Sequence, residues 1–170
     1  MAIDPAELHI VIAPIAAGFA GFGSLASGLS QHGGDDSRVD AFRLATMLFS
    51  SLSTVMLGLL PATLQALLFA DVAALRVSAL AGVVAIIGYV PVSVWRITRL
   101  RDAPGFSRGG GLTNAACLLI AFAAFVTCAA GVAPDRTAGA YLLGLLGLLG
   151  SSMVMFWRII ASMLRPAHGS

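Results

Sequence analysis

Hydrophobic residues along the chain are gathered into five long stretches that are separated by short polar segments. None of these stretches contains Asp, Glu, Lys or Arg, and each is close to the about 20 apolar residues that a helix needs to cross a bilayer. A helix also bonds all of its backbone groups internally, as hydrocarbon requires. The stretches are 8–29, 44–64, 77–94, 112–132 and 138–156.

This pattern predicts an all-α integral membrane protein that is a bundle of five transmembrane helices. When the polar residues that flank each stretch are included, the helices are expected at about 8–30, 38–67, 72–100, 112–132 and 136–164. Together with their connections they use nearly all 170 residues, so we expect a single membrane domain over 1–170. The glycine-rich segment 101–111 lacks the lysine and the preceding strand of a phosphate-binding loop, and we expect a flexible connector there.

The overall composition excludes a soluble protein. Apolar residues make up 58% of the chain and charged residues 11%, and the mean hydropathy is +0.93, so polar surface could not cover such a core. All ten basic residues are arginine, which together with the many Ala and Gly residues indicates a bias of composition typical of bacteria. The net charge of +2 therefore does not point to nucleic acid as a partner.

The arginines are divided unequally between the two sides of the predicted membrane. Eight of them fall on one side, namely Arg38, Arg43, Arg96, Arg99, Arg101, Arg108, Arg158 and Arg165. Only Arg76 and Arg136 fall on the other side. Because cytoplasmic loops carry the excess of basic residues, we predict a multi-pass protein of the bacterial inner membrane with its N-terminus outside and its C-terminus in the cytoplasm.

Both tryptophans of the chain stand before Arg-Ile near the end of an apolar stretch. A shift of 62 residues aligns Trp95-Arg96-Ile97 with Trp157-Arg158-Ile159 and gives seven identities in the 21 positions 77–97. One interpretation is an internal repeat of 44–101 and 112–165, with two helical hairpins in the same orientation and the first helix outside the repeat. The other interpretation is that these identities arise by chance in a chain rich in Gly, Leu and Val.

A tryptophan followed by arginine is also what the boundary of a membrane helix favours, because indole prefers the headgroup level and guanidinium reaches water or phosphate. We therefore expect interfacial anchors at these positions, and the functional alternative is a bound lipid headgroup. The residues concerned are Trp95, Arg96, Arg99, Arg101, Arg108, Trp157 and Arg158.

Small residues recur at helical spacing in three of the stretches, and such residues let membrane helices approach closely. We expect these stripes to pack helices together, and a stripe left facing lipid would mark a contact with a partner or with a second copy. They consist of Ala16, Ala20, Ser24 and Gly28 in the first stretch, Ser50, Thr54, Gly58 and Ala62 in the second, and Gly144, Gly147 and Gly150 in the fifth.

Residues that carry catalytic or metal chemistry are scarce in the spans. The three histidines are placed at opposite sides or at span edges, so they cannot share a metal, and no acid or base for ion coupling lies within a span. Cys117 and Cys128 are three turns apart on one helix, about 16 Å, which is too far for a disulfide. We expect no cofactor and no metal.

The leading hypothesis is a non-enzymatic membrane protein that acts through helix contacts, as an accessory or assembly subunit or as a small self-associating bundle. Membrane lipids, another membrane protein or a second copy would be its partners. The alternative is a small homo-oligomeric channel or facilitator for an uncharged or weakly polar solute, with a path lined by hydroxyl groups and by carbonyl groups freed at Pro61 and Pro91. A third hypothesis is an enzyme that acts on lipids.

Overall fold

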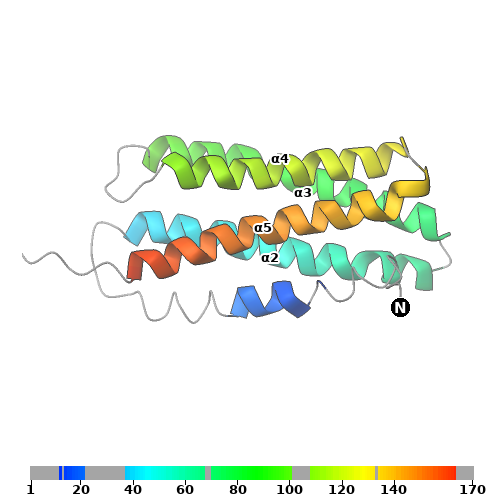
Figure 1. Ribbon diagram of the computed structural model, residues 1–170, viewed down its shortest axis with the longest axis horizontal. Coiled ribbons are helices and arrows are strands. Elements are labelled where there is room, and N and C mark those ends of the chain that lie inside the picture. The colour runs from blue at the N-terminus through cyan, green and yellow to red at the C-terminus, as the bar shows by residue number, and fades with distance from the viewer. Residues whose placement is uncertain are drawn as a thin grey trace, which may run out of the picture.

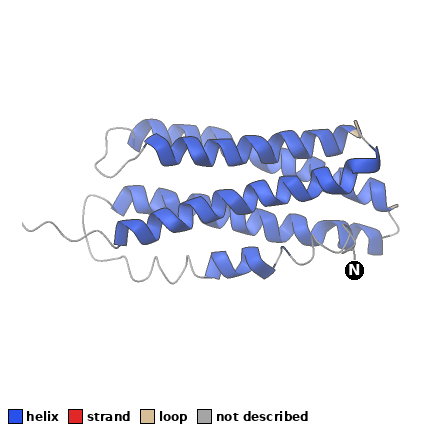
Figure 2. Ribbon diagram, viewed as in Figure 1, coloured by secondary structure: helices blue, strands red, loops and turns tan. Residues whose placement is uncertain are grey.

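The fold is a bundle of long helices, seen here in a computed structural model that describes residues 12, 14–21, 37–67, 70–100, 108–132 and 134–163 (Figure 2). The long helices are α2 (Ser37–Ala66), α3 (Asp71–Leu100), α4 (Arg108–Ala130) and α5 (Thr137–Met163), and a single 3₁₀ turn, Pro134–Arg136, leads into α5. Each of the four is long enough and apolar enough to cross a membrane. For the described residues the prediction of an all-helical structure is thus confirmed, as are four of the five predicted spans, by their length and composition.

The four long helices stand side by side in the order α2, α3, α4, α5, and α5 returns to contact α2 (Figure 1). Helices that follow one another in the chain are therefore neighbours in space, which is the up-down-up-down arrangement of four-helix bundles. The start of α2 and α4 lies at the same end of the bundle as the finish of α3 and α5, and we call it the Arg43 end. The opposite end is called the Arg76 end.

Part of the first predicted span is described, and it is helical at residues 12 and 14–21. This segment lies along the side of the bundle formed by α2 and α5 (Figure 1). Ile12 and Ala16 are buried, and the ring of Phe19 meets the ring of Phe156 edge to face at 5.6 Å between centroids. The segment therefore packs on the bundle through its apolar side chains.

The prediction of a flexible connector up to residue 111 is wrong at its C-terminal end. Helix α4 begins at Arg108, four residues before the predicted start, and so its first turn contains Gly109, Gly110 and Gly111. Glycine has a low intrinsic helix propensity, but tertiary packing commonly decides such a segment. Here the backbone of Gly110 lies directly against the side chain of Arg158 from α5, and a larger residue would collide with it.

The centre of the bundle is organised around the ring of Phe125 on α4, which is fully buried. Gly82 of α3 and Gly144 of α5 lie against this ring, so close that a Cβ atom on Gly144 would be 2.5 Å from it. The ring of Tyr141 meets that of Phe125 at 5.7 Å between centroids. The two glycines thus allow three helices to close around one aromatic side chain.

Candidate functional site

A row of fully buried hydroxyl groups runs along α2, at Thr46, Ser50, Ser51 and Thr54. Three of them donate to the carbonyl oxygen four residues earlier on their own helix, at 2.9 Å for Thr46 and Ser50 and 2.8 Å for Thr54. Such bonds satisfy a hydroxyl group in an apolar environment. The row can therefore lie inside the bundle without access to water.

The same row also connects α2 to its two neighbours. Ser50 and Ser152 of α5 share a hydrogen bond of 2.7 Å between their Oγ atoms, and Ser51 donates to the same Ser152 oxygen at 3.0 Å. On the other side, the hydroxyl of Tyr89 on α3 donates to Thr46 Oγ1 at 2.6 Å. These bonds fix the register of three helices, as polar side chains commonly do between membrane helices.

Further polar contacts complete the ring of helices. Ser151 of α5 donates to Asn114 Oδ1 of α4 at 2.6 Å, and the hydroxyl of Tyr141 on α5 donates to the carbonyl oxygen of Leu57 on α2. The thiol of Cys128 on α4 donates weakly to the carbonyl oxygen of Leu75 on α3 at 3.9 Å. Each adjacent pair of helices is thus joined by at least one side-chain hydrogen bond, and we call this set of groups the polar column.

At the Arg43 end the polar column meets charged groups. Arg43 is only 8% exposed and forms an ion pair of 2.7 Å with Asp40, whose carboxylate also accepts a hydrogen bond of 3.3 Å from Ser162. A cavity of about 20 Å³ lies beside them, and Arg43, Asn114 and Arg158 are among its lining residues. The cavity is therefore lined by residues of all four long helices.

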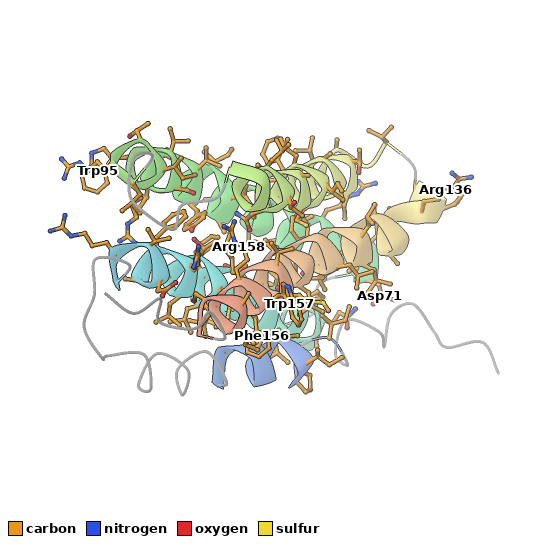
Figure 3. All side chains as sticks on the ribbon, turned by 60° about the vertical axis from the view of Figure 1, so that its left-hand side comes forward. Asp71, Trp95, Arg136, Phe156, Trp157 and Arg158 are labelled. Carbon is orange, nitrogen blue, oxygen red and sulfur yellow. The ribbon has the colours of Figure 1, made fainter. Side chains whose placement is uncertain are left out.

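The predicted interfacial anchors take different positions. Trp95 and Trp157 are exposed, and the guanidinium carbon of Arg99 lies 4.0 Å from the centre of the Trp95 ring. Arg96 is exposed as well, whereas Arg158, its equivalent in the predicted repeat, is half-buried and lies between the helices (Figure 3). The side chains of Arg101 and Arg108 lie outside the described residues.

The predicted packing stripes lie mostly inside the bundle. In α2, Ser50, Thr54 and Gly58 are buried and Ala62 is half-buried. Ala16, Gly144 and Gly147 are buried, Ala20 and Gly150 are half-buried, and Ser24 and Gly28 lie outside the described residues. The described members of the stripes are thus buried or half-buried and form no bare stripe on the surface of the bundle.

The outer surface between α2 and α3 carries a large apolar groove with a volume of about 650 Å³. Its floor and walls come from eight residues of α2 between Phe49 and Thr63 and from Ala81 and Ala85 of α3. Met56 on its edge is 70% exposed. We call this feature the α2–α3 groove.

Several residues of these sites were missed at the sequence level. The sequence pattern gives Arg43 only as a topology signal and does not single out Tyr89, Asn114 or Ser152. Asn114 is the only asparagine of the chain and lies within an apolar stretch, which was a usable signal because a buried amide needs a partner. Among the described residues, no group of three His, Cys, Asp or Glu side chains is placed to hold a metal ion.

Comparison with models of protein families, with curated proteins and with solved structures found no match to this chain.

Proposed function

We propose that this chain is a non-enzymatic integral membrane protein that acts through helix contacts, and that the α2–α3 groove receives a transmembrane helix. The groove is the observation that carries the proposal. Its lining is apolar, its volume is about 650 Å³, and it faces outward from a bundle whose predicted packing stripes are already used inside. An apolar surface is expected wherever a membrane protein faces lipid, so it is the hollow between α2 and α3, and not its apolar lining alone, that supports a contact with a helix.

The groove suits a helix because it combines small and large side chains. Ala81 and Ala85 leave room at one wall, and small residues let a second helix approach closely. Leu52 and Met56 stand out beside them with exposed fractions of 55% and 70%. The same surface therefore offers both a recess and projecting side chains, which a second copy in a two-fold symmetric dimer would match reciprocally.

The polar column supports a contact function over a path for solutes. Ser50 and Thr54 are fully buried, and their hydroxyl groups are bonded to their own helix. Of the two prolines whose missing N–H would free a carbonyl group for such a path, Pro91 lies on the exposed side of α3, and only Pro61 is buried. The alternative of a channel or facilitator would require these bonds to open.

The proposal is tested by the state of association in mild detergent, measured by light scattering and mass spectrometry. We expect the 17.4-kDa chain to elute as a defined oligomer or with another membrane protein in fixed ratio. Ala85→Phe fills the groove and should release the monomer, whereas Val84→Phe alters the neighbouring, 64% exposed position and should not. A wild-type protein that is monomeric and alone would contradict the proposal.

We further propose that the Arg43 end lies in the cytoplasm of a bacterium and that the membrane is the inner one, because the arginines gather there. The test uses single cysteines in a background in which Cys117 and Cys128 are replaced by alanine. Gly109→Cys should react with an impermeant maleimide only from the cytoplasmic side, and Gly139→Cys at the Arg76 end only from outside. Both glycines are exposed. The reverse pattern would overturn the orientation.

A further inference from the structure

We propose that Tyr141 of α5 is a positioning residue for the α2–α3 groove. Its hydroxyl group supplies the hydrogen bond that Pro61 cannot give to the carbonyl group of Leu57, and it thereby fixes the wall that α2 contributes to the groove. The role of this wall rests on the proposed contact with a transmembrane helix, but the test of Tyr141 needs no partner.

A proline interrupts the hydrogen bonds of α2 within the wall of the groove. An α-helix is held by a bond from each N–H group to the carbonyl oxygen four residues earlier, and Pro61 has no N–H group. The carbonyl group that loses its donor is that of Leu57. The groove is lined on both sides of the proline, by Leu57, Leu59, Leu60 and Thr63 among others. The wall therefore lacks one backbone hydrogen bond at the place where it borders the groove.

The missing bond is replaced from the other side of the bundle. The hydroxyl group of Tyr141 donates to the carbonyl oxygen of Leu57, since a carbonyl oxygen can only accept. Within a membrane, backbone groups that proline leaves free are commonly satisfied by a neighbouring helix. The bond from Tyr141 therefore makes good the loss at Pro61 and ties α2 to α5 at this level.

Tyr141 is itself held in place by its surroundings. Only 1% of the residue is exposed, and its ring meets that of Phe125 at 5.7 Å between centroids. The hydroxyl group of Ser78 on α3 interacts with the Tyr141 hydroxyl, and Ser78 lies three residues before Ala81, which lines the groove. One hydroxyl group thus contacts both helices that form the groove, from the inside of the bundle.

Loss of this hydroxyl group removes the donor from one backbone acceptor. Ser78 keeps its own bond of 2.8 Å to the carbonyl oxygen of Ala74, so the loss in Tyr141→Phe falls on the carbonyl group of Leu57. Helix α2 can then bend at the proline, which changes the shape of the groove. In Pro61→Ala, residue 61 regains an N–H group, and the Leu57 carbonyl no longer depends on the tyrosine.

The first test is a double-mutant cycle of Tyr141→Phe and Pro61→Ala. Unfolding by sodium dodecyl sulfate is followed through the reaction of the buried Cys128 thiol with a maleimide, in a background where it is the single cysteine. We expect Tyr141→Phe to shift the unfolding equilibrium by roughly tenfold or more when Pro61 is present, and by less than about threefold in Pro61→Ala. The control is Tyr89→Phe, whose lost hydroxyl bonds to Thr46 and not to a freed carbonyl group, and its cost should be equal in both backgrounds.

The second test measures the position of the wall with pairs of spin labels in a cysteine-free background. One label at Leu119, which is exposed on α4, is combined with a label at Thr63, beyond the proline, or at Leu52, before it. Tyr141→Phe should shift or broaden the distance distribution from position 63 and leave the distribution from position 52 unchanged. Addition of Pro61→Ala should restore the first distribution.

The proposal is overturned if Tyr141→Phe costs the same with and without Pro61, or if the distances from position 63 do not respond to it. If Tyr141→Phe alone does not fold, recovery of the folded state in the double variant supports the proposal, and a double variant that is also unfolded overturns it. Failure of the proposed helix contact is a different result, because it shows as a wild-type protein that is monomeric and alone.

Discussion

Replacement of Gly147 by alanine should push α4 and α5 apart and destabilise the whole bundle. A Cβ atom at this position would lie 2.9 Å from the backbone nitrogen of Ala121 and 3.0 Å from the carbonyl oxygen of Cys117. Since ordinary contacts begin at 3.4 Å, the two helix backbones would have to separate by roughly 0.5 Å. Overpacking of this kind costs about 1–3 kcal/mol, which corresponds to roughly 5- to 150-fold in the unfolding equilibrium.

The thiol of Cys128 is a suitable probe of unfolding, because it is 1% exposed in the folded bundle. In a Cys117→Ala background it is the single thiol, and its reaction with a maleimide can be followed as sodium dodecyl sulfate is added. Gly147→Ala should react at a lower fraction of the denaturing detergent. Gly139→Ala on the same helix, where a Cβ atom meets nothing within 4 Å, should match the parent. Equal unfolding curves for the two variants would refute the packing argument.

Three further predictions use the same unfolding assay. Phe125→Ala should cost about 3–5 kcal/mol because it empties the space between three helices, and a cost below about 1 kcal/mol would mean that the helices collapse onto it. Ser152→Ala should cost about 1–3 kcal/mol because the fully buried Ser51 loses the oxygen to which it donates, whereas Ser50 keeps its bonds within α2; an unchanged stability would show that Ser51 finds another acceptor. Gly131→Ala should cost about 1 kcal/mol or more, since its φ is 64° and Arg76 lies over it; an unchanged stability would contradict this backbone conformation.

The long helices could be predicted from the sequence because the hydrophobic signal is long and strong. The predicted ranges 38–67, 72–100 and 136–164 agree with α2, α3 and α5 to within one residue at each end. A run of apolar residues without charge has few other stable structures in a bilayer. The start of α4 could not be predicted in the same way, because Gly109–Gly111 become helical through their contact with a distant arginine.

The internal contacts were harder to predict, because spacing along one helix does not say which neighbour it faces. Ser50 and Thr54 were expected to serve as small packing residues, and the structure shows them buried with hydroxyl groups that bond within α2 and, for Ser50, to α5. The inward position of Arg158 had no local signal either, since Trp157-Arg158 repeats the letters of Trp95-Arg96. Only the tertiary packing of α4 against α5 distinguishes the two pairs. The repeat itself stays a prediction.

The central claim, that the α2–α3 groove receives a transmembrane helix, is tested most directly by site-specific photo-crosslinking in intact membranes. A photoreactive amino acid is placed at Met56 in the groove or at Leu119, which is 67% exposed on α4 and lies outside it. We expect a protein adduct of defined mass from position 56, with a second copy or with another membrane protein, and none from position 119. No protein adduct at position 56, or the same adducts at both positions, would contradict the proposed contact.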